Sequence, residues 1–210
     1  MTDPLRVWLN RLNRGQTEGR RDELAELYVR SCATAPGWEH RSREDFLLRL
    51  AGDIRRPQFA MLVAETPVLA GCAFGFPVRP DGSWWSGFQG ELPPGVARLT
   101  ASGDVFAITG MVVHPDERNR GLARRMQERL LTDHRASLGA TLVDGVNRAA
   151  RSAFWSWGWQ EIGEVHRPPG PTVLRALVLR AEERTAADSA DRAQRARARA
   201  RARARVQGTT

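Results

Sequence analysis

The distribution of apolar residues along the chain predicts an alternation of strands and helices. Apolar side chains recur every three or four positions in residues 20–33, as on one helix face, whereas residues 104–113 form an apolar, β-branched run typical of a strand. On this basis the strands are expected at residues 5–9, 58–65, 68–76, 104–113, 140–146, 159–165 and 172–180, and the helices at residues 20–33, 42–56, 121–136 and 147–158. This order, β-α-α-β-β-β-α-β-α-β-β, predicts an α/β fold with a mixed central sheet flanked by helices.

Proline and glycine mark the boundaries between these elements. Pro57 ends the second helix, and the pair Thr66–Pro67 separates two apolar runs that are expected to form a hairpin. Residues 77–103 are rich in glycine, proline, serine and tryptophan and are expected to form a long loop. A loop of that length in a compact domain usually has a function.

The last part of the chain differs in composition from the rest. Of the net charge of +8, the eight arginines and two aspartates of residues 184–210 contribute +6, and residues 195–205 alternate strictly between arginine and alanine. Such a segment has no apolar stripe to bury, so we expect a solvated arm without a core. The sequence therefore predicts a folded domain over residues 1–181 and a basic arm over residues 182–210.

Several classes of protein do not fit this sequence. No apolar run approaches the roughly 20 residues needed to cross a bilayer, and the N-terminal residues lack the apolar segment of a secretory signal, so a cytoplasmic protein is expected. The two cysteines, Cys32 and Cys72, are expected to be reduced, with Cys72 a small core residue. No cysteine and histidine residues share metal-ligand spacing, so no metal site is expected.

The transition from strand to helix after residue 113 has the features of an anion-binding turn. The first turn of a helix presents backbone N–H groups without partners, and the helix dipole adds partial positive charge there. Gly121 and the small Ala123 let a phosphate approach the backbone, while Arg118 and Arg120 add charge. This turn lacks the Gly-Lys-Ser/Thr of a nucleotide-binding P-loop and the Gly-x-Gly-x-x-Gly of a dinucleotide-binding fold.

The residues of this turn and of a second block resemble the GNAT superfamily of N-acyltransferases. Its acyl-CoA motif, Arg/Gln-x-x-Gly-x-Gly/Ala after a strand, is met by Arg118, Gly121 and Ala123. The second block is Asn, Ala three residues later, an aromatic residue at +7 and Gly-aromatic at +11 and +12. In this chain those positions are occupied by Asn147, Ala150, Phe154, Gly158 and Trp159.

The resemblance implies the family's fold and its use of acetyl-CoA. Strands four and five would splay apart to admit the thioester, and the backbone of Met111 and Val113 would pair with the pantetheine arm. The backbone N–H of Met111 would also stabilise the oxyanion. The complete acetyl-CoA site implied is Met111, Val112, Val113, Arg118, Asn119, Arg120, Gly121, Leu122, Ala123, Asn147 and Phe154.

Two side chains that the family often uses are missing. Its strand-four glutamate would fall near Gly110, and its proton-donating tyrosine would fall at Phe154. The single tyrosine, Tyr28, lies in a helix stripe and is expected in the core. A thiol with a pKa near ~8.5 can leave unassisted, so catalysis is compatible with these losses.

The acceptor side is less well defined by the sequence. Glu39 and His40 between the first two helices, and Asp104 at the start of strand four, are the candidate bases. Trp84 and Trp85 in the long loop either form a wall of the acceptor site or cover the edge of the sheet.

Three functions remain open on the sequence alone. The first is an acetyl-CoA-dependent N-acetyltransferase that acts on a primary amine of a small molecule or peptide. The second is a module of the same fold that binds acyl-CoA without turnover, as Gly110 and Phe154 would allow. The third is a nucleic-acid-associated protein that acts through the weak, non-specific phosphate contacts of residues 184–210.

Overall fold

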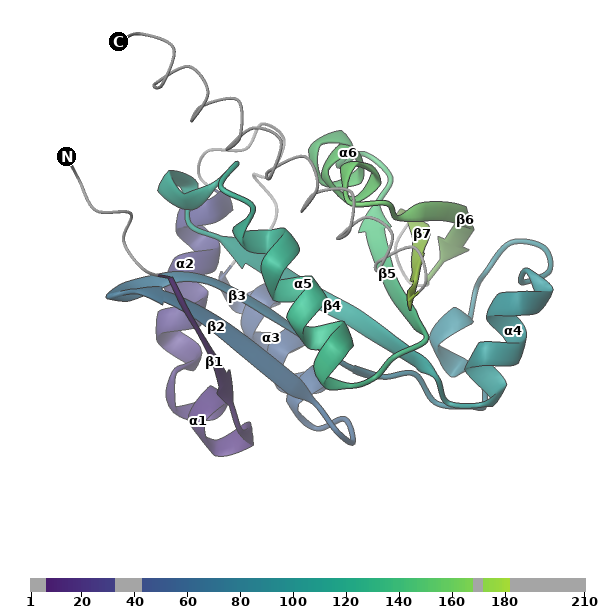
Figure 1. Ribbon diagram of the computed structural model, residues 1–210, viewed down its shortest axis with the longest axis horizontal. Coiled ribbons are helices and arrows are strands. Elements are labelled where there is room, and N and C mark those ends of the chain that lie inside the picture. Colours follow the sequence, from purple (N-terminus) through teal and green to yellow (C-terminus); the bar gives the residue numbers. More distant parts are fainter. Residues whose placement is uncertain (1–6, 33–42, 168–171, 182–210) are drawn as a thin grey trace, which may run out of the picture.

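The computed structural model describes residues 7–32, 43–167 and 172–181, and within them seven strands form one sheet in the order β1-β2-β3-β4-β5-β7-β6 (Figure 1). The strands are β1 (Trp8–Leu12), β2 (Ala60–Thr66), β3 (Val68–Pro77), β4 (Val105–Val113), β5 (Leu138–Asp144), β6 (Gln160–His166) and β7 (Val173–Arg180). The helices are α1 (Arg14–Gly19), α2 (Arg21–Cys32), α3 (Arg43–Ile54), α4 (Pro94–Ala101), α5 (Leu122–Asp133) and α6 (Arg148–Ser156), with short 3-10 turns η1 (Ser83–Trp85) and η2 (Pro115–Glu117). Neighbouring strands are antiparallel except β4 and β5, which are parallel. The predicted mixed α/β sheet is therefore confirmed.

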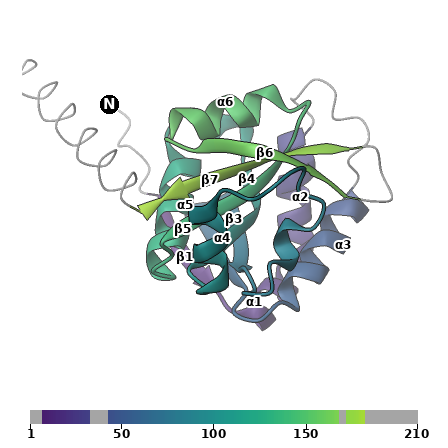
Figure 2. The ribbon, with the colours of Figure 1, turned by 90° about the vertical axis from the view of Figure 1, so that its right-hand side faces the viewer.

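Strand β2 shows why helices cover both faces of this sheet. Leu62 packs into the core beneath α5, whereas Met61 and Val63 pack into the core beneath α2 and α3. Successive side chains of a strand point to opposite faces, so a strand with two buried faces is apolar at every position. Figure 2 shows the sheet between α5 on one side and α2 and α3 on the other.

The apolar stripes of α2 and α3 pack against each other and against the sheet. Tyr28 is buried and stacks on Phe46 with ring centroids 4.7 Å apart, and Phe46 meets the ring of Phe74 on β3 edge-on at 6.2 Å. Tyr28 is thus the core residue that the stripe predicts. Because these helices rest on β3 and β4, they hold their inward-facing residues beside the centre of β4.

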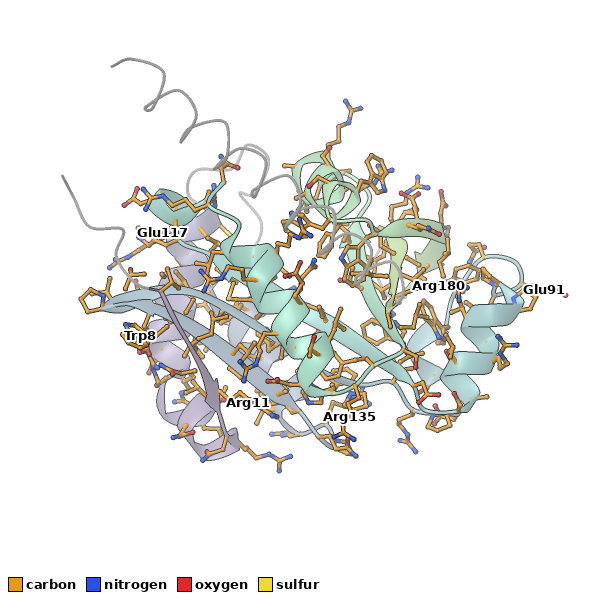
Figure 3. The ribbon with its side chains drawn as sticks, viewed as in Figure 1. Trp8, Arg11, Glu91, Glu117, Arg135 and Arg180 are labelled. Carbon is orange, nitrogen blue, oxygen red and sulfur yellow. The ribbon has the colours of Figure 1, made fainter. Side chains whose placement is uncertain are left out.

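The N-terminal elements correct the sequence-based assignment. The first strand was expected at residues 5–9, but β1 extends to Leu12, and Trp8 and Arg11 project from it at the edge of the sheet (Figure 3). Helix α1 was not expected. Asn13 begins it with a capping box, in which Gln16 N–H donates to the Asn13 side chain at 2.9 Å and the Gln16 side chain accepts from the Asn13 N–H.

The segment 77–103 also differs from the expected loop, because it contains η1 and α4. Pro94 occupies the first position of α4, where a missing N–H costs no hydrogen bond. Val96 and Thr100 face inward, and the Thr100 hydroxyl accepts a 2.9 Å hydrogen bond from the buried indole N–H of Trp85. The proline- and glycine-rich composition hid an element that its tertiary contacts stabilise.

The parallel pair β4–β5 opens into a splay. In the described part of the chain, β4 pairs with β5 only at residues 105–107, opposite residues 138–140. Beyond that point one hydrogen bond still links the strands, from the Thr141 hydroxyl to the Ile108 carbonyl oxygen at 2.9 Å. The separation of strands four and five, which the family resemblance implies, is therefore present.

The described residues contain no helix long and apolar enough to cross a membrane. They also contain no cluster of three or more histidine, cysteine, aspartate or glutamate residues that could hold a metal ion. Cys32 and Cys72 are free thiols, and complete burial of Cys72 raises the pKa of its thiol to about 12.

Candidate active site

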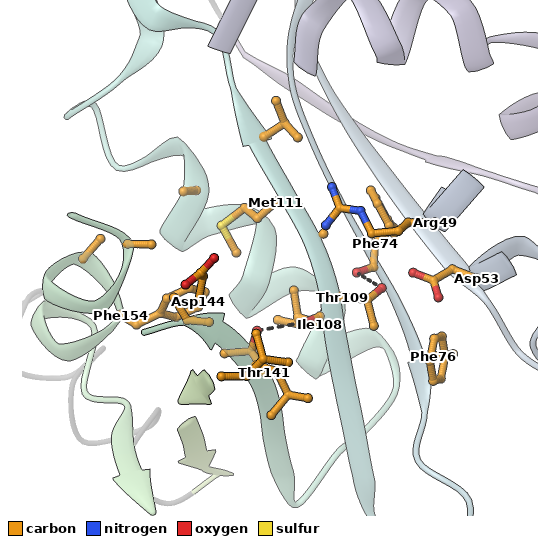
Figure 4. Close-up of a pocket in the computed structure, with 18 of the residues that line it drawn as sticks. Arg49, Asp53, Phe74, Phe76, Ile108, Thr109, Met111, Thr141, Asp144 and Phe154 are labelled. Atoms are coloured by element: carbon orange, nitrogen blue, oxygen red, sulfur yellow. Dashed lines mark hydrogen bonds between the residues drawn. The ribbon is translucent and has the colours of Figure 1, made fainter. Parts of the chain in front are cut away.

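A cleft of about 2000 Å³ lies where β4 and β5 separate. Its walls come from α2, α3, β3, β4, β5, the turn before α5, α6 and the segment before η1. The close-up in Figure 4 shows that β4 runs through this region with different side chains on its two sides. Met111, Thr141, Asp144 and Phe154 lie on the β5 side, and Arg49, Asp53, Phe74, Phe76 and Thr109 lie on the α3 side.

The turn before α5 presents unsatisfied backbone N–H groups to this cleft. Gly121 is the N-cap residue of α5, with φ of 74°, and no side chain caps the helix. Among the described residues no acceptor is bonded to the N–H groups of Gly121, Leu122 or Ala123. A Cβ at Gly121 would meet no heavy atom within 4 Å, so the space over the turn is open. These features fit an anion such as a pyrophosphate.

The arginines of the turn have different partners. The Arg118 guanidinium donates to the backbone carbonyl of Ser31, which ties the turn to the end of α2, and it also lines the cleft. Arg120 is exposed and is paired with Glu117 at 3.2 Å. Arg120 does not line the cleft. Its contact with acetyl-CoA stays a prediction.

The backbone of β4 offers a free edge beside the turn. His114 N–H donates to the Ala70 carbonyl at 2.8 Å, and Cys72 lies opposite Val112. Hydrogen-bonded pairs alternate along antiparallel strands, so the N–H and C=O groups of Met111 and Val113 point away from β3. They face the side from which β5 has separated, where a peptide-like arm can pair with them.

Asn147 and Phe154 lie on α6 at the far wall of the same space. The Asn147 side-chain oxygen caps α6 by accepting from Ala150 N–H at 3.1 Å, which leaves the amide NH2 group to bind a ligand. The Phe154 ring is buried between Trp157 and Trp159, at centroid distances of 5.3 and 5.0 Å.

A bulge in β4 explains why no carboxylate stands on this strand. Gly110 lies opposite Phe74 and Ile108 lies opposite Gly75, so Thr109 is the extra residue. A Cβ at Gly110 would lie 2.1 Å from the Phe74 ring, so no side chain fits there.

A carboxylate of α3, that of Asp53, lies in the cleft beside β4. Asp53 lines the cleft beside Thr109 (Figure 4). Burial raises the pKa of the Asp53 carboxyl above its usual range, while the nearby Thr109 hydroxyl and the charges of Arg56 and Arg49 partly offset this rise. The Thr109 hydroxyl itself donates to the Phe74 carbonyl oxygen at 3.5 Å. A partly buried carboxyl with a raised pKa is suited to accept a proton near neutral pH.

The candidate bases from the sequence do not occupy this position. Asp104 is exposed at the opposite end of β4, where its carboxylate accepts a 2.6 Å hydrogen bond from Ser102. Seven residues of strand separate it from Met111, which is about 20 Å. Asp104 is therefore too far away to act as the base. Glu39 and His40 lie outside the described residues.

The two tryptophans of the long loop have separate roles. Trp84 lines the cleft, and its ring packs edge-on against Phe76 at 5.9 Å. Trp85 is a core residue, 4% exposed, that contacts Phe88 and hydrogen-bonds Thr100. Of the two alternatives that the sequence leaves open for Trp85, the structure favours the covering role, because its indole bonds to Thr100 of α4 and it does not line the cleft.

Four cleft residues on the α3 side were missed by sequence reasoning. For Asp53 a signal was present, since it follows Phe46 and Leu50 at helical spacing and so places a carboxylate on the apolar stripe of α3. The others are Thr109, which depends on the bulge, and Arg56 and Arg167, which come from segments far apart in sequence.

Comparisons with known proteins agree with this geometry. The model of the acetyltransferase (GNAT) family matches residues 21–159. A GNAT-family protein from Desulfovibrio desulfuricans is similar in structure, with a TM-score of 0.58 and 12% identity over 83% of this chain and 99% of that one. An acetyltransferase from Thermus thermophilus has a TM-score of 0.55 and 17% identity over 84% and 97% of the two chains.

A third similar structure was solved with a ligand. The yncA protein of Salmonella typhimurium, determined with its cofactor acetyl-CoA, has a TM-score of 0.52 and 14% identity over 83% of this chain and 94% of that one. At these identities the likenesses show the fold. A search of curated proteins found no match.

Proposed function

The chain belongs to the GNAT acetyltransferase family, and from this premise we propose that it transfers the acetyl group of acetyl-CoA to a primary amine of a small molecule or peptide. One observation carries the proposal. A single cleft contains the anion-binding turn before α5, the free edge of β4 and the Asp53 carboxyl. These are the three parts that direct acyl transfer from a phosphate-bearing thioester requires.

The residues on the β5 side fit acetyl-CoA. The N–H groups of Gly121, Leu122 and Ala123 would hold the pyrophosphate, with Arg118 adding charge. The backbone of Met111 and Val113 would pair with the pantetheine arm, and Asn147 would donate its amide NH2 to it. Arg124 also lines this region, from the first turn of α5.

The chemistry proceeds by direct attack of a neutral amine. Asp53, which lies beside Thr109 in the cleft, accepts the proton that the ammonium form must lose. The amine nitrogen then forms a bond to the thioester carbon, and the Met111 N–H stabilises the oxyanion. When the C–S bond breaks, the nitrogen gives up its second proton and the thiolate leaves. This proton and the thiolate become the thiol of CoA, directly or through water.

A non-catalytic acyl-CoA-binding module is the second candidate. It is favoured by Phe154, which has no hydroxyl to protonate the thiolate, and by Gly110, where Phe74 leaves no room for a side chain. It is disfavoured by Asp53, whose pKa is raised at the acceptor side of the cleft.

Turnover separates these two candidates. A panel of primary amines would be incubated with acetyl-CoA, and release of the CoA thiol would be followed for the wild-type chain and for Asp53→Asn. We expect thiol release that depends on the amine and that falls about 100-fold or more in Asp53→Asn. Tight binding of CoA with no amine-dependent release from any acceptor would support the binding module.

A further inference from the structure

The α3 side of the cleft carries more positive than negative charge. Arg49 and Arg56 approach from α3 and the residues just after it, and Arg167 approaches from the residue after β6. Asp53 is the carboxylate that lies among them. With Asp53 ionised, these four groups still carry a net charge of +2.

Aromatic rings hold two of these arginines in place. The Arg56 guanidinium lies over the ring of Phe76 at 5.4 Å, and the Arg167 guanidinium lies over the ring of Trp84 at 5.1 Å. Phe76 and Trp84 are themselves in edge-to-face contact at 5.9 Å. Arg167 also donates a 2.6 Å hydrogen bond to the Trp84 carbonyl. The four side chains therefore form a continuous row, Arg56–Phe76–Trp84–Arg167, along the cleft wall.

Both guanidinium groups in this row are exposed, and the charge of Arg56 acts on the nearby Asp53 carboxyl. Neither Arg56 nor Arg167 forms an ion pair with any residue that the structure describes, whereas the neighbouring Arg79 is paired with Asp81 at 3.2 Å. Desolvation lowers the pKa of the Arg167 guanidinium, and the like charge of Arg56 lowers it further, although Arg167 keeps part of its surface open to solvent. The buried indole N–H of Trp84 also donates to no described residue. A bound anion would relieve this repulsion and supply the missing acceptor oxygens.

We propose that the acceptor is a zwitterionic amine, whose anionic group, a carboxylate or a phosphate, is bound by Arg56 and Arg167 while its amino group reaches Asp53. This inference rests on the proposed acetyl transfer and names the chemical class of the acceptor.

The turn at the end of α3 limits the size of such an acceptor. Asp53 lies in the last turn of α3, which ends at Ile54, and the N–H of Arg56 just beyond the helix donates to the Asp53 carbonyl at 2.9 Å. This bond keeps the two residues within about one turn of each other, where Cβ atoms are about 5–6 Å apart. One small molecule can therefore place an amine at Asp53 and an anion at Arg56. Amino acids, peptides with a free amine near the carboxylate, and aminoalkyl phosphates satisfy this condition. Polyamines and other purely cationic amines do not satisfy it, because the arginines of the cleft repel them.

Matched acceptor pairs test the proposal directly. The twenty amino acids would be compared with their amides, and phosphoethanolamine with ethanolamine, using thiol release from acetyl-CoA as the readout. We expect the best anionic acceptor to exceed its neutral partner in kcat/KM by at least tenfold. The amino group of an amide is less basic than that of the acid, so a larger fraction is neutral and reactive. Basicity alone would therefore favour the amide, so a preference for the acid cannot be explained by the reactivity of the amine.

Arginine variants test whether Arg56 and Arg167 cause the preference for anionic acceptors. Arg56→Gln and Arg167→Gln should each reduce the ratio between anionic and neutral acceptors at least tenfold, chiefly by raising KM for the anionic acceptor. Arg55→Gln is the matched control, because Arg55 adjoins Arg56 in sequence but does not line the cleft. Affinity for CoA, measured by calorimetry, should be unchanged in all three variants, which shows that each is folded.

Two results would overturn the inference. The first is equal or better turnover of the neutral partners, and the second is an anion preference that survives both Arg56→Gln and Arg167→Gln. Absence of turnover with every amine defeats the proposed acetyl transfer instead. In that case calorimetric titration with the same acceptors tests whether the arginines bind the anionic group. The anion site would be supported if the anionic acceptor binds more tightly than its neutral partner and if Arg56→Gln weakens that binding. Equal binding of the two acceptors would refute the anion site.

Discussion

The two sides of β4 build their binding surfaces from different parts of the chain. On the β5 side, most groups proposed to bind acetyl-CoA are backbone N–H and C=O groups of β4 and of the turn before α5, with the side chains of Arg118 and Asn147 added, and the Phe154 ring is buried. On the α3 side, the groups proposed to act are side chains: the Asp53 carboxylate, the Thr109 hydroxyl and the guanidinium groups of Arg49, Arg56 and Arg167.

This difference predicts how each side responds to mutation. A backbone surface changes little when a side chain is replaced, unless the new side chain obstructs the backbone. A side-chain surface loses its chemistry with a single substitution. The β5 side is therefore suited to one ligand used throughout a family, and the α3 side to an acceptor particular to this chain.

Replacement of Asp53 should have the largest effect on kcat/KM. This effect should be confined to the α3 side of β4. Asp53→Asn keeps the shape of the side chain but removes the base, so kcat/KM should fall about 100-fold or more. Affinity for CoA should be unchanged by calorimetry. Asp104→Asn is the matched control and should leave kcat/KM at the wild-type value, since Asp104 is exposed and distant from the cleft. A modest loss in Asp53→Asn would assign the proton transfer to another group.

Obstruction of the turn before α5 should lower the affinity for CoA on the β5 side, by a smaller factor than the loss expected for Asp53→Asn. Gly121→Glu places a side chain and a negative charge over the free N–H groups, so CoA affinity measured by calorimetry should fall at least tenfold, or about 1.4 kcal/mol. The backbone at Gly121 has a positive φ, so the substitution also carries strain. Gly90→Glu controls for strain, because Gly90 has a similar φ of 84°, open space around it and no place in the cleft lining. Unchanged affinity in a folded Gly121→Glu chain would refute the anion site.

Phe154 tests whether the β5 side contributes a side chain to the chemistry. Phe154→Leu removes its contacts with Trp157 and Trp159 and should lower the free energy of unfolding by about 1–2 kcal/mol, with little effect on turnover. Phe154→Tyr restores a hydroxyl and raises the rate of the chemical step if the hydroxyl reaches the leaving sulfur. A large loss of turnover in Phe154→Leu, with normal CoA affinity, would contradict unassisted departure of the thiolate.

The ionisation of Asp53 should appear as a small pH-dependent change in stability. A carboxyl whose pKa is raised by folding binds its proton more tightly in the folded state. Its contribution to stability is therefore greatest below its ordinary pKa and is lost as pH rises through the raised value. Asp53→Asn should accordingly be more stable than the wild type at neutral pH and lose this advantage in acid, as measured by Tm. The rising limb of kcat/KM with pH should lie above the range of an ordinary aspartate.

Removal of residues 184–210 should leave both sides of β4 unchanged. A chain ending at Glu183 is predicted to keep its Tm and its affinity for CoA, because the cleft as described uses none of the removed residues. The full chain is predicted to bind DNA or RNA weakly, through the eight arginines of this segment, and this binding should weaken steeply between about 50 and 200 mM salt. Nucleic-acid binding that persists after truncation would place it on the folded domain instead.

The sequence alone predicted most of the elements and the turn before α5 that is proposed to bind acetyl-CoA. Both depend on local information. Helical and strand periodicities are properties of short windows, and the motif at Arg118, Gly121 and Ala123 is one strand–turn–helix. Where local signals were weak, as in the short helices α1 and α4, the sequence-based assignment failed. Those helices rely on a capping box and on buried contacts such as that between Trp85 and Thr100.

Only the tertiary structure decided the acceptor side. Asp53 and Thr109 lie beside each other because α3 and β4 share one core and because Thr109 is the extra residue of the β4 bulge. Arg56 and Arg167 are far apart in the sequence and become neighbours through Phe76 and Trp84. No short window of sequence contains these pairings, since each depends on how distant segments fold over the same strand. Charge and chemistry on this side are therefore products of packing, whereas the turn before α5 carries its chemistry in its own backbone.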